Sequence, residues 1–170
     1  MSKNLLPKHA FFISGTGRHP DRLQAFDEAL LSAGPLAHNL VSVSSILPAQ
    51  CKIITPEEGF AMLTPGEITF CVMAKQETNQ PTEVASAAIG IAKIKDPQSF
   101  GYLSEYHGNA QGESEAGEIA KRLAIEMFAR KLKIPCENLD LDINHAQAAS
   151  IKQSGNEEWV CAVALCVFVI

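Results

Sequence analysis

The longest apolar run of the chain lies at its C-terminal end, over residues 160–170. This run is too short to cross a bilayer as a helix, which takes about 20 residues. We therefore expect a buried strand that begins at Glu157-Glu158 and continues through Val169. Apolar strands cannot face water, so helices must cover one or both faces of the sheet that contains this strand.

The rest of the chain alternates between segments with strand-like and helix-like periodicity. The expected strands cover residues 11–14, 39–46, 68–75, 101–107 and 139–145, with 52–54 continuing the second one. The expected helices cover residues 21–33, 82–92 and 113–132, and a capping box at 55–58 opens a further short helix. Residues 15–20 are expected to form a turn. Without strict βαβ alternation, this order predicts one domain, residues 1–170, of the α+β class.

Charge and cysteine content narrow the class of partner and the compartment. The net charge of −5 weighs against nucleic acid, because a phosphate backbone favours clustered Lys and Arg. The five cysteines form no CxxC pair, which predicts reduced thiols in a cytoplasmic protein. No Cys or His pair has the spacing of zinc ligands, so no metal is expected. Residues 1–9 lack the apolar stretch of a signal peptide, and no membrane partner is expected.

The helix expected over residues 21–33 carries a carboxylate on its apolar face. At 100° per residue, Leu23, Phe26, Leu30 and Leu31 share one face, and Asp27 falls between Leu23 and Leu31. Burying a carboxylate without a partner is costly. From periodicity alone, Asp27 is therefore expected at the edge of the stripe, where it reaches solvent or caps a neighbouring loop.

The chemically informative stretch is residues 38–48, which contains the pair Ser44-Ser45. A Ser-Ser pair alone usually marks a turn or a strand end. An ordered set of residues makes the chain resemble the pyruvoyl-dependent arginine decarboxylases over residues 9–169, nearly its whole length. The set comprises Ala25-Phe26-Asp27, Ala29-Leu30-Leu31, Ala33-Gly34, Asn39, Ser44-Ser45-Ile46-Leu47-Pro48, Pro65-Gly66, Glu105-Tyr106 and Gly108.

The resemblance implies a fold, an activity and an assembly. It implies a layered α/β sandwich with mainly antiparallel sheets covered by helices, assembled as a homotrimer or a pair of trimers. The implied reaction is decarboxylation of L-arginine to agmatine and CO2, a step of polyamine biosynthesis or acid resistance. The cofactor would be a self-made pyruvoyl group that binds the substrate amine, with no PLP and no metal.

The resemblance also implies a role for each matched site residue. Autocatalytic serinolysis between Ser44 and Ser45 would give chains 1–44 and 45–170, and Ser45 would become the pyruvoyl group. Asn39 would assist the cut, and Glu105 would donate the proton to the product. Asp27 would bind the substrate guanidinium as a two-bond ion pair.

One distance complicates the role of Asn39. Along a straight strand, Asn39 and Ser45 would lie about 20 Å apart at roughly 3.3 Å per residue. Either the chain folds back between them, or Asn39 serves the Ser45 of a neighbouring subunit.

Two alternatives stay open at this point. The first is the same chemistry on another amino acid, such as lysine or ornithine, which would depend on the pocket around Asp27, Leu36 and His38. The second is a non-catalytic, unprocessed binding homologue, with which an intact Ser45 is compatible.

Overall fold

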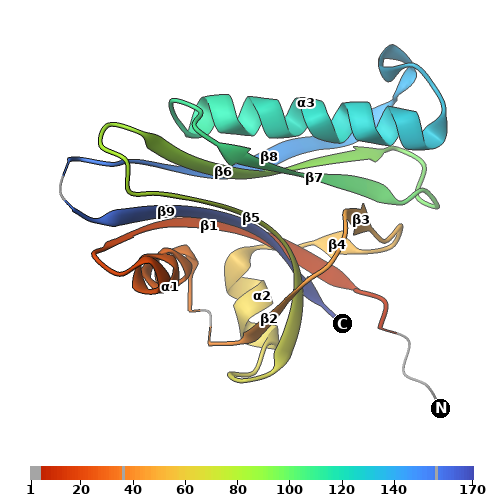
Figure 1. Ribbon diagram of the computed structural model, residues 1–170. Helices are drawn as coiled ribbons and strands as arrows, with labels where there is room; N and C mark the ends of the chain where they lie inside the picture. Colours follow the sequence, from red (N-terminus) through yellow and green to blue (C-terminus); the bar gives the residue numbers. More distant parts are fainter. Residues whose placement is uncertain (1–4, 36, 156) are drawn as a thin grey trace.

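Two stacked β-sheets form the centre of the computed structural model, which describes residues 5–35, 37–155 and 157–170 (Figure 1). The first sheet has the strand order β2-β5-β9-β1-β4, and the second has the order β3-β7-β6-β8. The strands of the first sheet are β1 (His9–His19), β2 (Asn39–Ser42), β4 (Lys52–Ile53), β5 (Ile68–Thr78) and β9 (Trp159–Val169). Those of the second are β3 (Ile46–Leu47), β6 (Val84–Ile94), β7 (Gly101–Gly108) and β8 (Leu141–Lys152). The second sheet is antiparallel, whereas the first is mixed because β2 and β4 each pair in parallel.

Helices cover the outer faces of the stack (Figure 1). α3 (Glu113–Leu132) packs on the second sheet, and α1 (Arg22–Ala33) and α2 (Pro56–Met62) pack on the first. A short 3-10 turn, Cys136–Asn138, follows α3. The expected helix over residues 113–132 is confirmed, and so is the capping box of α2, in which Thr55 and Glu58 cap each other's backbone amides. These elements confirm the α+β class.

β9 is the central strand of the first sheet, between β5 and β1. Residues 160–168 are all buried. Alternate side chains of β9 face the second sheet and the helices on the outer face, so these residues have no surface toward water. The prediction of a buried C-terminal strand is therefore confirmed. Within the described part of the chain, no helix has the length and apolar character needed to span a membrane.

β1 is longer than expected, because residues 15–19 continue the strand instead of forming a turn. Here α1 lies directly on β1. A Cβ atom on Gly17 would collide with the backbone of Ala25 and Ala29 on α1. The prediction of a turn over residues 15–20 is wrong, since the glycines of this segment permit close approach of a helix to a strand.

The segment expected as an alanine-rich helix, residues 82–92, is instead strand β6, and that prediction is wrong. Residues 84–92 are buried, with one face against the first sheet and the other against α3. A Cβ on Gly90 would collide with the backbone of Ala120 on α3. Small side chains are needed here for close packing of layers, so tertiary packing overrides the helix propensity of alanine.

Candidate active site

The segment that carries Ser44-Ser45 crosses from one sheet to the other. β2 ends at Ser42, at the edge of the first sheet. The chain enters β3 at Ile46, at the edge of the second sheet beside β7. The prediction of one strand over residues 39–46 is therefore wrong, because its two halves pair with different sheets. The serine pair lies between these halves, outside both strands.

Backbone hydrogen bonds hold this crossing in place. Ser44 O accepts from Ile46 N at 3.1 Å, and Ser45 O accepts from Leu103 N of β7 at 2.8 Å. The first bond directs a donor at the carbonyl that Ser45 Oγ would attack, where a donor stabilises the developing oxyanion. Sequence reasoning does not find either donor, because nearly every residue carries a backbone N–H and only the fold orients it.

Ser44 also lines an apolar hollow of about 340 Å³ at the same end of the stack. The other walls come from the N-terminal segment, the crossing, β5 and the C-terminal end: Leu5, Pro7, Val43, Ile46, Pro48, Phe70, Phe168 and Ile170. Ser44 is exposed and Ser45 is half-buried.

Glu105 lies on β7 two residues beyond Leu103, whose amide bonds Ser45. Residues two apart on a strand share a face and lie about 6.6 Å apart. Burial raises the pKa of the Glu105 carboxyl, and nearby His107 lowers it in part. In the single chain Glu105 is nevertheless exposed to solvent. The structure thus brings Ser45 and Glu105 close together within one chain.

Tyr106 points to the opposite face of β7. Its ring packs with the α3 cluster, and its hydroxyl accepts a hydrogen bond from Ala110 N at 3.2 Å. The Tyr106 hydroxyl therefore faces away from Ser45.

Asn39 starts β2, at the end of that strand remote from the crossing. Its side-chain Nδ2 donates to Gly66 O at 2.8 Å, and its backbone N donates to Glu67 O at 2.9 Å. The strand from Asn39 to Ser42 spans about 10 Å, and Ser45 lies three residues farther on. The chain does not fold back over β2, so Asn39 and Ser45 of one chain stay apart.

Asp27 stands on the solvent-facing side of α1. The buried side of the helix is Ala25 and Ala29, whereas Leu23 and Leu31 are 73% and 62% exposed. The prediction that Leu23 and Leu31 belong to the buried face is wrong, because α1 rests on β1 through its small residues. Asp27 reaches solvent, as periodicity alone suggests, and its side chain makes no hydrogen bond or ion pair with any described residue.

His38 precedes β2, and neither of its ring nitrogens has a hydrogen-bond partner within the described ranges. Leu36, the other residue expected near the substrate pocket, lies outside the described residues. The structure describes no group of His, Cys, Asp and Glu that is arranged to hold a metal ion.

The fold and this arrangement define an α+β protein with a serine pair between two sheet edges and a carboxyl on the adjoining strand. A family model described as pyruvoyl-dependent arginine decarboxylase matches residues 9–170. The chain belongs to this family, which confirms the expected pyruvoyl cofactor in place of PLP.

Named relatives match along most or all of the chain. A pyruvoyl-dependent arginine decarboxylase of Methanocella arvoryzae is 41% identical, and one of Methanosarcina acetivorans is 37% identical; each alignment spans 171 positions and 100% of both chains. One from Methanococcoides burtonii is 47% identical over 130 residues, which cover 76% of this chain and 72% of the relative.

Proposed function

We propose that this chain decarboxylates L-arginine to agmatine and CO2 with a pyruvoyl group made from its own Ser45. The observation that carries the proposal is the position of Ser44-Ser45 at the crossing between the sheets, bonded to the strand that bears Glu105. Further support comes from the relatives, which are named as arginine decarboxylases that depend on a pyruvoyl group.

Self-cleavage begins at the Ser44 carbonyl. Ser45 Oγ attacks the carbonyl carbon, an ester replaces the amide, and β-elimination separates residues 1–44 from residues 45–170. Hydrolysis at the new N-terminus releases ammonia and leaves the pyruvoyl group. The Ile46 amide supports the first step, since its hydrogen bond is directed at the oxygen that becomes negative.

Glu105 supplies the proton in the decarboxylation itself. The pyruvoyl group, when formed and joined to the substrate amine, supplies an electron sink for loss of CO2. Glu105 then protonates the α-carbon, for which its carboxyl must be neutral. The raised pKa of Glu105 supports this role, because burial penalises the charged form and keeps more of the acid protonated near neutral pH.

Asp27 and Asn39 act across a subunit boundary in this proposal. Each lies away from Ser45 within one chain, so a neighbouring chain supplies them in a homotrimer or a pair of trimers. The exposed Leu23 and Leu31 beside Asp27 support this assembly, since an apolar stripe of that kind fits a protein interface. At the interface, the Asp27 carboxylate pairs with the substrate guanidinium through two hydrogen bonds.

The compartment proposed is the cytoplasm. All five cysteines are free thiols, and four of them are buried, which suits a reducing environment.

Intact-mass measurement of purified protein, paired with turnover assays, tests the proposal. We expect two masses that correspond to residues 1–44 and to residues 45–170 with an N-terminal pyruvoyl group, together with turnover of arginine. One stable uncut mass without a reducible carbonyl would instead favour the non-catalytic homologue. Faster turnover of lysine or ornithine than of arginine would favour the alternative substrate class.

A further inference from the structure

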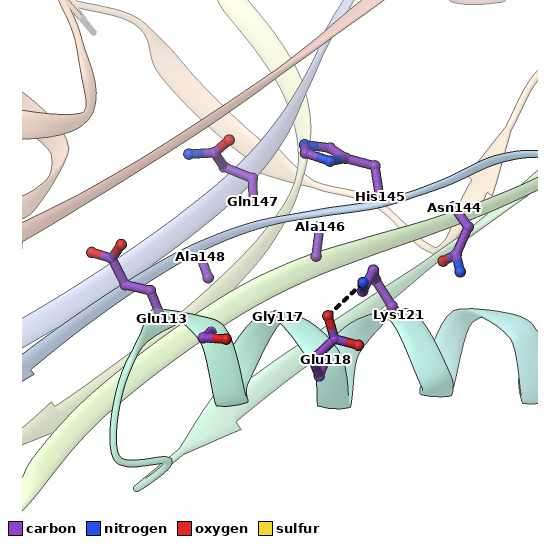
Figure 2. A pocket seen from close by; sticks show the side chains of 10 residues that line it. Glu113, Gly117, Glu118, Lys121, Asn144, His145, Ala146, Gln147 and Ala148 are labelled. Atoms are coloured by element: carbon purple, nitrogen blue, oxygen red, sulfur yellow. Dashed lines mark ion pairs between the residues drawn. The ribbon is translucent and has the colours of Figure 1, made fainter.

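Two lysines are half-buried in the part of the chain that the structure describes, Lys93 and Lys121. Lys121 lines an open groove of about 360 Å³ between α3 and β8, and its ammonium pairs with the Glu118 carboxylate of the same helix (Figure 2). Lys93, near the end of β6, forms no ion pair with any described residue, and its Nζ donates to Ala49 O at 2.9 Å. This bond fixes a point of the main chain with a charged donor, and hydrogen bonds of charged groups are the stronger ones.

Lys93 reaches Ala49 from the inner face of the second sheet. Ile89 and Ile91 of β6 belong to the core between the two sheets, and alternation along the strand places Lys93 on the same face. The pairing of β6 with β8 is regular up to Lys93, because the shift in register falls after it. The lysine thus extends from the second sheet to the segment between β3 and β4.

Ala49 belongs to the turn that returns the chain from the second sheet to the first. Cys51 N donates to Pro48 O at 3.0 Å, which closes this turn between β3 and β4. β3 has only two residues, and Ser45 comes directly before it. The bond from Lys93 therefore restrains, from the downstream side, the short strand that presents Ser45.

Self-cleavage changes what holds Ser45 in place. In the uncut chain the crossing is attached on both sides, because Val43 N donates to Cys71 O of β5 at 2.9 Å upstream and β3 follows downstream. The cut would free residue 45 from the upstream attachment. The downstream attachments are the bond from Leu103 N to Ser45 O, the two residue pairs of β3, and the turn that Lys93 holds. A chain end with few attachments is more mobile than the same residue inside a chain.

We propose that Lys93 is a positioning residue, which acts through Ala49 and β3 to hold the pyruvoyl-bearing chain end beside Glu105 after the cut. The inference rests on the proposed function, since it requires a pyruvoyl group at position 45. Lys93 acts through the main chain and takes no part in the bond changes. Its loss should therefore affect turnover more than self-cleavage, because the upstream attachment is still present while the cut is made.

The test measures fragment formation by intact mass, and then kcat and KM per pyruvoyl group. Lys93→Met should cut within about threefold of the normal rate but lower kcat roughly tenfold, the rate equivalent of one hydrogen bond. KM for arginine should change less, because Asp27 binds the far end of the substrate in the proposed mechanism. Lys95→Met is the matched control and should equal the unmodified enzyme, since the Lys95 ammonium bonds exposed Asp140 instead of the turn.

A conservative variant separates the tie from general stability. Lys93→Arg should recover most of the lost kcat, because the guanidinium keeps a charged donor for Ala49 O. If Lys93→Met does not fold, Lys93→Gln gives the same comparison, since it removes the charge and shortens the side chain. Equal losses in cutting and in kcat would overturn the proposal, because the tie would then serve the uncut chain just as much.

The same measurements separate this inference from the function on which it rests. An unmodified chain that stays uncut would remove both the proposed function and the role of Lys93. An unmodified chain that cuts and decarboxylates arginine, beside a Lys93→Met variant with unchanged kcat per pyruvoyl group, would refute the role of Lys93 alone.

Discussion

The crossing at Ser44-Ser45 and the outer stripe of α1 contribute to the proposed site in different ways. Backbone bonds to β7 hold the crossing beside Glu105 within one chain. Asp27 projects from α1 into solvent, between two exposed leucines. In the proposed mechanism, the groups that must meet with precise geometry for cutting and proton transfer are thus held by one fold. A group that meets only the far end of a substrate can come from another subunit.

Ser45→Ala should have the largest effect, because it removes the attacking oxygen at the crossing. We expect a folded chain that stays uncut, with no turnover above background. Denaturing intact mass and a carbonyl titration measure this. Ser42→Ala is the matched control on the same segment and should cut normally. Appearance of the 45–170 fragment in the Ser45 variant would remove that serine from the mechanism.

Glu105→Gln should cut normally yet lower turnover about 10²–10⁴-fold, the usual range for a general acid. The activity of the unmodified enzyme should fall as pH rises through the raised pKa of Glu105, since only the neutral carboxyl donates. Turnover per pyruvoyl group, measured across pH, is the readout. Tyr106→Phe is the control, because Tyr106 faces α3. Full turnover in the Gln variant would assign the proton to another acid.

Asp27→Asn should raise KM for arginine more than it lowers kcat. Loss of one member of a buried charge pair costs about 2–5 kcal/mol, equivalent to roughly 30-fold or more in binding. Asp21→Asn is the control, because asparagine also caps a helix well. An unchanged KM would take Asp27 out of the site and reopen the choice of substrate.

Assemblies of two different variants test whether Asp27 on α1 acts on the Ser45 of another subunit. Chains with Asp27→Asn, mixed with chains that carry Ser45→Ala, should regain part of the activity if Asp27 and Ser45 meet between subunits. No regain in assemblies proven to be mixed would place both residues in one chain.

Asn39→Ala should slow self-cleavage by about tenfold, the rate equivalent of one hydrogen bond worth about 1–1.5 kcal/mol. The same change removes the bond to Gly66 O, so a small loss of stability should accompany it. Time courses of fragment formation measure the rate. A normal rate would show that Asn39 only holds the loop at Gly66.

His107→Gln should have the smallest effect, a shift in the pH profile. Loss of the electrostatic interaction with His107 should raise the pKa of Glu105 further. The fall in turnover with rising pH should therefore move to higher pH. A shift to lower pH would contradict the proposed interaction.

Features that depend on neighbours in the sequence could be predicted. The C-terminal strand follows from its uninterrupted apolar run, the α2 capping box from Thr55 and Glu58, and α3 from its apolar period. The family and its pyruvoyl cofactor could also be predicted, because the matched residues recur in order along the chain. Each of these signals lies in local chemistry or in residue order, which the sequence shows directly.

Tertiary packing decided the features that the sequence did not predict. β6 is a strand in spite of its alanines, because two layers close on it and only small side chains fit. α1 turns Ala25 and Ala29 inward and leaves Asp27 in solvent for the same reason. Residues 39–47 divide between two sheets, since their edge positions depend on partners far away in the sequence. Burial and pairing are properties of the assembled layers, so short-range patterns could not reveal them.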